Sequence, residues 1–349
     1  MSYFRWFAAG INKDKDNNTI VPKIYTSTNG TTWNEYTMGN NSTTWYETKC
    51  IKSGGPSKNS TKKLLVAVGN GYNNDKKYIS PIIVSENEGQ NWITATFNNV
   101  DFLNYNVILN SVDYNNTVYI AVGKMWNDKG SAPLLMKSYN GYDWQHEYRP
   151  FIDTMKDLEF YDVKFINTDR CIAVGKFKEN GNLRYIYCSR NPYGSLWNSI
   201  NWSYGNYYIP KRITYFGSQY FLSNIYSNTI FASRSNWDVS AWNRYLTNLS
   251  GEIRALTNSA PNRVIVGGQD DSIPLTYTNN GTIYSDCTIK NNPNSVINCL
   301  SKVVNGIIMA GDINGRIYRS LDNGYSWQIV FVPDPNIKLS LNSIDCVIY

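Results

Sequence analysis

Ser320-Leu321-Asp322-Asn323-Gly324-Tyr325-Ser326-Trp327 is the stretch that decides the fold, because the chain repeats it. A second full copy is Ser85-Glu86-Asn87-Glu88-Gly89-Gln90-Asn91-Trp92. Three copies are one residue shorter: Ser27–Trp33, Ser138–Trp144 and Thr278–Tyr284. Two more copies are degenerate: Ser189–Trp197 and Ser233–Trp242. The closing aromatic residues are 42 to 59 residues apart, which is typical of one propeller blade.

A second motif runs in phase with the first, upstream of each copy. It is an apolar strand that ends in a small residue and Gly: Ala8-Ala9-Gly10, Ala67-Val68-Gly69, Ala121-Val122-Gly123, Ala173-Val174-Gly175, Ile265-Val266-Gly267 and Met309-Ala310-Gly311. Only the fifth unit departs, with Leu222-Ser223-Asn224. Two motifs in one phase over seven units predict an all-β, seven-bladed propeller of four-stranded antiparallel blades.

The two ends of the chain predict how the ring closes. The segment Leu341-Asn342-Ser343-Ile344-Asp345 resembles Leu109-Asn110-Ser111-Val112-Asp113, the innermost strand of the third unit. The N-terminus, in contrast, begins at a second strand, so the last strand is expected to complete the first blade. The expected single domain, 1–349, divides into blade 1 (341–349 plus 1–40) and blades 2 to 7 (41–99, 100–150, 151–204, 205–249, 250–291 and 292–335).

Each repeated box is interpreted as a turn with a structural role. Asp or Asn accepts backbone hydrogen bonds within its own turn, Gly supplies a positive φ, and the closing aromatic packs beneath the turn. The residues expected to hold the turns are Asn29, Gly30 and Trp33; Asn87, Gly89 and Trp92; Asn140, Gly141 and Trp144; Asn280, Gly281 and Tyr284; and Asp322, Gly324 and Trp327.

These boxes resemble those of the Asp-box (BNR-repeat), sialidase-like propeller family, and the resemblance spans the whole chain. It implies that the boxes lie at the blade periphery, away from the ligand. Sialidases have six blades, an Arg-Ile-Pro motif, an arginine triad and a Tyr/Glu pair, whereas this chain offers only Lys211-Arg212-Ile213-Thr214, without the Pro. The resemblance is therefore to the seven-bladed, non-sialidase branch, which includes photosystem II assembly factor-type propellers that bind partners without chemistry.

Function is expected on the opposite face, which carries the loops between second and third strands and between blades. The first four blades offer basic loops there, and the last two offer acidic ones. The candidate residues are Lys13, Lys15, Lys76, Lys77, Lys124, Trp126, Lys176, Asp270, Asp271 and Asp312. The interblade loops add aromatic residues that either stack on a ligand or pack in the core: Trp45, Phe102, Tyr105, Phe151, Tyr207 and Tyr208.

Composition narrows the class of protein. The chain is 42% hydrophobic and 15% aromatic, which indicates a globular protein. Its net charge of +6 is dispersed, which argues against nucleic acid as a partner. Six scattered cysteines and a single histidine predict free thiols in a reducing compartment and no metal site. No signal peptide or membrane span is expected. A preference for Asn, Lys, Ile and Tyr is typical of AT-rich genomes, such as those of large viruses or protists, so the expected location is the cytoplasm or a virion.

No catalytic constellation or cofactor motif emerges from the sequence. Five carboxylates are nominally available on the loop-bearing face, but nothing pairs them as a glycosidase requires: Asp101, Asp157, Glu159, Asp270 and Asp312. His146 follows a box Trp and is interpreted as structural. We expect a non-enzymatic scaffold that binds a protein partner, with no cofactor. The alternatives are a glycan-binding lectin and a glycoside hydrolase of sialidase-like fold.

Overall fold

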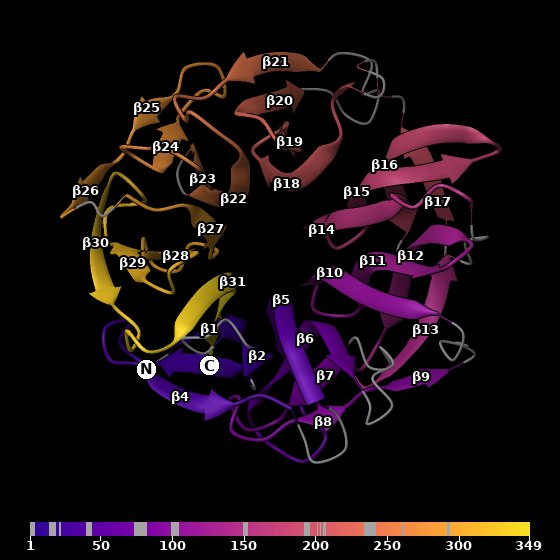
Figure 1. Ribbon diagram of the computed structural model, residues 1–349, viewed down its shortest axis with the longest axis horizontal. Helices are drawn as coiled ribbons and strands as arrows, with labels where there is room; N and C mark the ends of the chain where they lie inside the picture. Colours follow the sequence, from indigo (N-terminus) through magenta and orange to yellow (C-terminus); the bar gives the residue numbers. More distant parts are fainter. Residues whose placement is uncertain are drawn as a thin grey trace.

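Seven β-sheets surround a central axis in the computed structural model, as predicted (Figure 1). The structure describes residues 4–13, 19–20, 22–39, 44–72, 82–98, 105–148, 153–191, 196–200, 202, 204, 207–233, 242–259, 262–291 and 294–349. Each sheet is one blade whose first strand lies innermost. The seven innermost strands are β31, β5, β10, β14, β18, β22 and β27, and together they surround the axis.

The first four blades contain these strands, from the axis outward. Blade 1 has β31 (Lys338–Ile348), β1 (Phe4–Lys13), β3 (Lys23–Ser27) and β4 (Asn34–Thr37), with β2 (Thr19–Ile20) on β1. Blade 2 has β5 (Thr44–Pro56), β6 (Lys63–Tyr72), β7 (Ile82–Ser85) and β8 (Ile93–Thr94). Blade 3 has β10 (Asn106–Tyr114), β11 (Tyr119–Asn127), β12 (Gly130–Ser138) and β13 (Asp143–Tyr148). Blade 4 has β14 (Glu159–Asn167), β15 (Arg170–Glu179), β16 (Asn182–Asn191) and β17 (Leu196–Ile200).

The remaining blades follow the same order. Blade 5 has β18 (Pro210–Phe216), β19 (Gln219–Asn224), β20 (Thr229–Ser233) and β21 (Asn243–Leu246). Blade 6 has β22 (Ile253–Ser259), β23 (Arg263–Gly268), β24 (Leu275–Thr278) and β25 (Ser285–Asp286). Blade 7 has β27 (Ile297–Leu300), β28 (Ile308–Asp312), β29 (Ile317–Ser320) and β30 (Ser326–Phe331).

Two short strands add an outer link that the sequence did not predict. β9 (Thr96–Asn98) leaves blade 2 and pairs parallel with β13 of blade 3. β26 (Thr288–Lys290) leaves blade 6 and pairs parallel with β30 of blade 7. The outermost strand of blade 3 is therefore hydrogen-bonded to a segment that follows blade 2, and that of blade 7 to a segment that follows blade 6. These segments give blades 3 and 7 a fifth strand.

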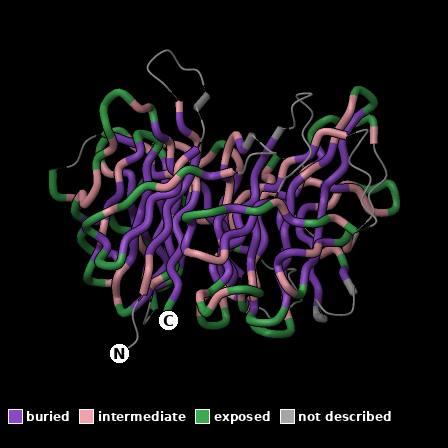
Figure 2. The backbone as a smooth tube through the Cα atoms, turned by 90° about the horizontal axis from the view of Figure 1, so that it is seen from below, coloured by how far each residue is buried: buried purple, intermediate pink, exposed green. Residues whose placement is uncertain are grey.

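The predicted closure of the ring is confirmed. β31 pairs antiparallel with β1 from Phe4 opposite Ile348 to Lys13 opposite Lys338. Leu341 and Cys346 of β31 are fully buried, so this strand contributes to the core as well as to the sheet. The C-terminus lies at the bottom of Figure 2, and Phe4, the first described residue, pairs with Ile348 beside it.

The core lies between blades rather than within them. Along β6, Leu64, Val66 and Val68 pack against blade 3, whereas Leu65 and Ala67 pack against blade 1. All five side chains are buried. This alternation explains why the second strands are continuously apolar, as the sequence predicted: each is covered on both faces by a neighbouring blade. Seven such clusters, one for each pair of adjacent blades, form the core.

Every innermost strand carries a β-bulge at the same register. The bulged residue, which has no partner on the second strand, is Asn342, Lys49, Asn110, Tyr161, Lys211, Arg254 or Asn298 in blades 1 to 7. We call these seven residues the bulge ring. Because a bulge bends its strand and shifts the alternation of side chains by one residue, it decides which side chains face the axis.

The bulge also explains the glycine of the second motif. A Cβ on Gly123 would lie 2.0 Å from the Ile108 carbonyl oxygen of its own blade. Gly10, Gly69 and Gly175 face the inner strand in the same way, at 1.8 to 2.1 Å. The sequence interpretation, in which the small residues let neighbouring sheets approach, therefore misses the main reason for this glycine. In blade 6 the equivalent position is Gly268, one residue after the motif.

The repeated boxes form the turns between third and fourth strands. In blade 3, the Ser138 hydroxyl accepts a 2.8 Å hydrogen bond from the Gly141 amide, and Asn140 accepts from the amides of Tyr142 and Asp143. Gly141 has a φ of 78°, and the Trp144 indole donates to its carbonyl. Two of these bonds, from the Gly amide to the Ser or Thr hydroxyl and from a following amide to the Asn or Asp, have counterparts at Ser27, Ser85, Thr278 and Ser320, so these residues serve their own turns.

Candidate functional site: the axial cavity

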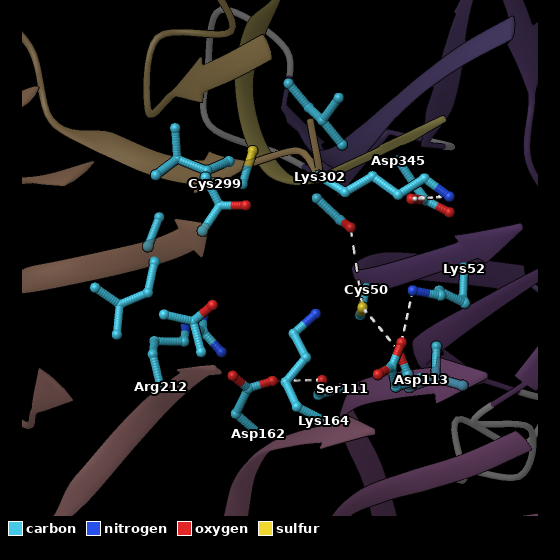
Figure 3. Close-up of a pocket in the computed structure, with 18 of the residues that line it drawn as sticks. Cys50, Lys52, Ser111, Asp113, Asp162, Lys164, Arg212, Cys299, Lys302 and Asp345 are labelled. Atoms are coloured by element: carbon cyan, nitrogen blue, oxygen red, sulfur yellow. Dashed lines mark hydrogen bonds and ion pairs between the residues drawn. The ribbon is translucent and has the colours of Figure 1, made fainter. Parts of the chain in front are cut away.

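The innermost strands of all seven blades enclose a cavity of about 350 Å³ on the axis (Figure 3). Six cationic side chains line it, against three carboxylates. The cations are Lys49, Lys52, Lys164, Arg212, Arg254 and Lys302, and the carboxylates are Asp113, Asp162 and Asp345. Since the cations outnumber the carboxylates two to one, the cavity favours anionic groups.

The position three residues after each bulge shows how the charges are arranged. In blades 1 to 4 it holds Asp345, Lys52, Asp113 and Lys164, so the charge alternates from blade to blade. Lys302 of blade 7 lies 3.7 Å from Asp345 and extends the series. We call these five residues the ladder.

Two neighbouring members of the ladder, Lys52 and Asp113, form a close ion pair. The Lys52 ammonium lies 2.6 Å from the Asp113 carboxylate, and both side chains are largely buried. Burial by itself lowers the pKa of Lys52, but Asp113 and Asp345 outweigh it and raise that pKa above its ordinary value of 10.5. Burial likewise raises the pKa of Asp113, yet Lys52 and Lys164 hold it below 3.8. Both groups are therefore charged at neutral pH.

The three carboxylates also join neighbouring blades. Asp345 accepts a 2.7 Å hydrogen bond from the Ser53 amide of blade 2, and Asp113 accepts a 2.8 Å bond from the Phe165 amide of blade 4. Asp162 accepts from the Ile213 amide of blade 5 at 3.0 Å. Each carboxylate thus satisfies a backbone donor of the following blade, which stabilises both the charge and the ring.

Blades 5 and 6 have no counterpart of the ladder. Thr214 and Thr257 occupy the position three after the bulge there. Arg212 lines the cavity and donates to the carbonyls of Arg254 and Tyr161, at 2.9 and 3.4 Å. Within the described residues no carboxylate lies within ion-pair distance of Arg212. This side of the cavity is cationic and rich in hydroxyl groups.

Lys164 ends the ladder next to blade 5. Its side chain extends into the cavity in Figure 3. Asp113, its nearest partner in the ladder, is already paired with Lys52 at 2.6 Å. In the part of the chain that the structure describes, the Lys164 ammonium forms neither a hydrogen bond nor an ion pair. A half-buried ammonium without a partner leaves three donors for a ligand.

The bulge ring lies nearer the loop-bearing mouth of the cavity. Its asparagines reach across blades: Asn298 donates to the Leu341 carbonyl, Asn342 to the Thr48 carbonyl and Asn110 to the Phe160 carbonyl. Lys211 and Arg254, also in this ring, share the single carboxylate of Glu252. Within the bulge ring, the two cations of blades 5 and 6 therefore have one carboxylate between them.

Two cysteines face this cavity from the position one residue after the bulge, Cys50 in blade 2 and Cys299 in blade 7. Burial raises the pKa of both thiols. All six cysteines of the chain are unbridged. A raised pKa keeps Cys50 and Cys299 protonated at neutral pH, so they are poor nucleophiles.

Some of the candidate residues named from the sequence lie near the mouth. Lys124 pairs with Glu159 at 3.3 Å, and its ammonium lies 5.2 Å from the centroid of the Trp126 ring. Lys176 pairs with Asp157. Lys13 lies at the far end of β1, opposite Lys338. Lys15, Lys76 and Lys77 fall outside the described residues.

The acidic candidates have structural roles instead. Asp312 is fully buried and accepts hydrogen bonds from Ser295, Arg316 and Tyr318. It occupies the position that glycine holds in most blades. Asp270 accepts from three backbone amides, and these bonds overcome burial and lower its pKa to about 2. Only Asp271 is exposed without such a role.

Of the aromatic residues expected in the interblade loops, some pack in or against the core and one is exposed. Trp45 is buried and donates to Thr48, and Tyr105 and Tyr208 pack against core clusters. Tyr207 is 91% exposed. Phe102 and Phe151 lie outside the described residues. A ring that the sequence did not single out, Tyr226, is 85% exposed at the short turn between β19 and β20, with a φ of 56°. Such strain in a non-glycine residue is typical of functional surfaces.

The sequence did not predict the residues that line the axial cavity as a functional site, although it singled out segments that contain Asp345, Asp113 and Arg212. A signal was available: aligning the seven inner strands would have revealed the alternation of Asp345, Lys52, Asp113 and Lys164. That alignment depends on the bulge, which the sequence does not mark directly.

Two of the three carboxylates in the lining, Asp113 and Asp345, have a lowered pKa. Among the described carboxyl groups, every one with a shifted pKa has it lowered: Glu86, Asp113, Asp153, Asp270, Asp322 and Asp345. A glycosidase needs a carboxyl group whose raised pKa lets it act as an acid. The described residues also contain no cluster of His, Cys, Asp or Glu that could hold a metal ion, and no helix that could cross a membrane.

No protein-family model and no curated protein matches the chain. Among solved structures, YCF48 from Cyanidioschyzon merolae is similar over 84% of this chain and 88% of its own, with 16% identity and a TM-score of 0.53. A structure of YCF48 bound to D1 peptide is similar over 76% and 78%, with 13% identity and a TM-score of 0.51. The GH74 enzyme of Niastella koreensis is similar over 80% and 53%, with 12% identity and a TM-score of 0.50. At these identities the likeness shows the propeller fold alone.

Proposed function

We propose that this chain is a non-enzymatic scaffold that binds a segment of a protein partner at the loop-bearing mouth of its axial cavity. The observation that carries the proposal is the state of the lining: its carboxylates are engaged by the protein itself, whereas Lys164 and Arg212 have no carboxylate partner. Such a surface offers cationic and hydroxyl donors to a polar or anionic ligand.

Two exposed tyrosines near this mouth support a protein partner. Tyr226 lies in the turn between β19 and β20, on the loop-bearing face, and it is among the groups that raise the pKa of Tyr161 in the bulge ring. Tyr207 precedes β18, whose residues line the cavity. Tyrosine and arginine are both enriched at protein interfaces. The likeness to YCF48 bound to D1 peptide supports a peptide ligand by analogy of fold. We also propose that the turns belong to the Asp-box class, on the pattern of their hydrogen bonds.

A display selection tests this function. A library of random peptides is selected against the whole chain, and the enriched peptides are measured against Tyr226→Ser and against Tyr139→Ser. Tyr139 is also exposed, at 51% against 85% for Tyr226, but it lies in a box turn. We expect binding to weaken at least fivefold in Tyr226→Ser and to persist in Tyr139→Ser. Peptides that bind both variants equally well would contradict the proposed face.

The GH74 likeness keeps the two carbohydrate alternatives testable. A glycan array in which specific glycans bind with higher affinity than any selected peptide would indicate a lectin instead. Turnover of fluorogenic glycosides that is abolished by Glu159→Gln or Asp157→Asn, two carboxylates near the mouth, would establish a glycoside hydrolase.

A further inference from the structure

We propose that the side of the axial cavity between blades 4 and 5 is a seat for a single carboxylate group, held by Lys164 and Arg212 with Thr214 as a hydroxyl donor. This inference deepens the proposed function, and it rests on that function only for the source of the carboxylate. The three residues come from β14 and β18, adjacent inner strands that both line the cavity.

Several hydrogen-bond donors of the seat have no acceptor among the described residues. Arg212 donates two of its five N–H groups to carbonyl oxygens, at 2.9 and 3.4 Å. In the described part of the chain, the Lys164 ammonium and the Thr214 hydroxyl form no hydrogen bond, although Thr214 is buried. None of these donor atoms is among the fully buried atoms without a partner, so they are open to the cavity, where a ligand can accept their hydrogen bonds.

The local charge indicates how many anions fit. Asp162 lies between the two cations in the ring, and it is occupied by the Ser111 hydroxyl and by the amides of Val163 and Ile213. Two cations and one carboxylate leave one uncompensated positive charge. A carboxylate, with one negative charge and two acceptor oxygens, matches this better than a phosphate dianion does.

The positive charges of Lys164 and Arg212 affect cysteines of other blades that line the cavity. Lys164 lowers, and thereby partly offsets, the raised pKa of Cys50 in blade 2. Arg212 acts in the same sense on Cys299 in blade 7. Both residues line the cavity, and the Lys164 side chain extends into it in Figure 3, where an entering side chain would meet it.

Two sources could supply the carboxylate: an acidic side chain of the partner segment, or a small free acid. The test uses acetate and two blocked peptides, acetyl-Gly-Gly-Glu-Gly-Gly-amide and its Gln counterpart. Binding to the whole chain is followed by ligand-observed NMR, with ionic strength held constant with chloride. We expect the Glu peptide to bind about tenfold more tightly than the Gln peptide, the difference typical of one charge-assisted hydrogen bond.

Matched variants locate the binding. Lys164→Gln and Arg212→Gln should each remove the preference for the Glu peptide. Lys23→Gln makes the same change of charge at a lysine of β3 that pairs with Glu35, and it should keep the preference. If Arg212→Gln does not fold, because its carbonyl bonds are lost, Lys164→Gln decides alone. An equal preference in wild type and Lys164→Gln, or no preference in wild type, would overturn the seat.

The same titrations separate the two sources. Acetate that binds as well as the Glu peptide indicates a free small acid, and a Glu peptide that binds more tightly indicates a partner side chain. Either result supports the seat. The two proposals can fail separately. A negative result for the carboxylate seat does not change the display selection with Tyr226→Ser, which tests the proposed function. A negative selection does not change the acetate titration, which tests the seat.

Discussion

Blades 1 to 4 and blades 5 to 7 present the same bulged strand to the axis, but they fill the position three residues after the bulge differently. The first group holds Asp345, Lys52, Asp113 and Lys164; Lys52 and Asp113 form an ion pair, whereas Lys164, at the end of the series, has no ion-pair partner among the described residues. The second group holds Thr214, Thr257 and Ser301. The charges of blades 1 to 3 and of Lys302 in blade 7 are thus paired within the ladder, whereas Lys164 of blade 4 and Thr214 of blade 5 keep donors without a partner among the described residues. Stability and binding therefore depend on different sectors of one ring.

Removing β31 should have the largest effect, because it opens the ring and takes Asp345 out of the ladder. Deletion of residues 340–349 exposes Phe7 and Ala8 and breaks the pairing of β1. We expect the truncated chain to lose its cooperative thermal transition or to unfold at a much lower temperature. An unchanged midpoint in differential scanning calorimetry would contradict the closure of the ring.

Asp113→Asn should have the next largest effect, since it leaves the largely buried Lys52 ammonium without its partner. Breaking one side of a buried pair typically costs about 3 to 5 kcal/mol. Thr214→Val, in the other half of the ring, removes a hydroxyl without a partner and should change the free energy of unfolding by less than about 1 kcal/mol. Urea denaturation of both variants measures the difference, and equal losses would mean that the two halves do not differ.

Acid should weaken the ladder half selectively. Lys52 and its neighbours keep the folded-state pKa values of Asp113 and Asp345 below 3.8 despite burial. Their stabilisation is therefore fully present above about pH 4 and is lost as the pH falls through the lower folded-state values. The unfolding free energy of wild type should decline below pH 4, and that of Asp113→Asn should decline less steeply. Parallel curves in the two proteins would argue against the pairing.

Lys164→Met should have the smallest effect on stability. Lys164 ends the ladder, and its ammonium has no ion-pair partner among the described residues, so little is lost with the charge. We expect the free energy of unfolding to change by less than about 0.5 kcal/mol, in contrast to Asp113→Asn. A loss as large as that of Asp113→Asn, measured in the same urea series, would show that Lys164 is a structural member of the ladder.

Part of the site was predictable. The sequence indicated the loop-bearing face, and Lys124 and Trp126 do lie together near the mouth. It also suggested an acidic sector at Asp270 and Asp312, which the structure instead shows supporting local turns. A charged residue in a short loop bonds to the nearest backbone amides when these are free, and neither composition nor spacing reveals that outcome.

The sequence by itself determined the number of blades, the turns and the closure, because each depends on local chemistry repeated at a fixed period. Gly141 and Asn140 specify their turn without reference to the rest of the chain. Only the tertiary structure decided which side chains meet on the axis. Lys52, Asp113, Lys164 and Arg212 are about 50 residues apart in sequence, and the closed ring brings them together. A bulge in each inner strand, which shifts the alternation by one residue, selects the side chains that face inward.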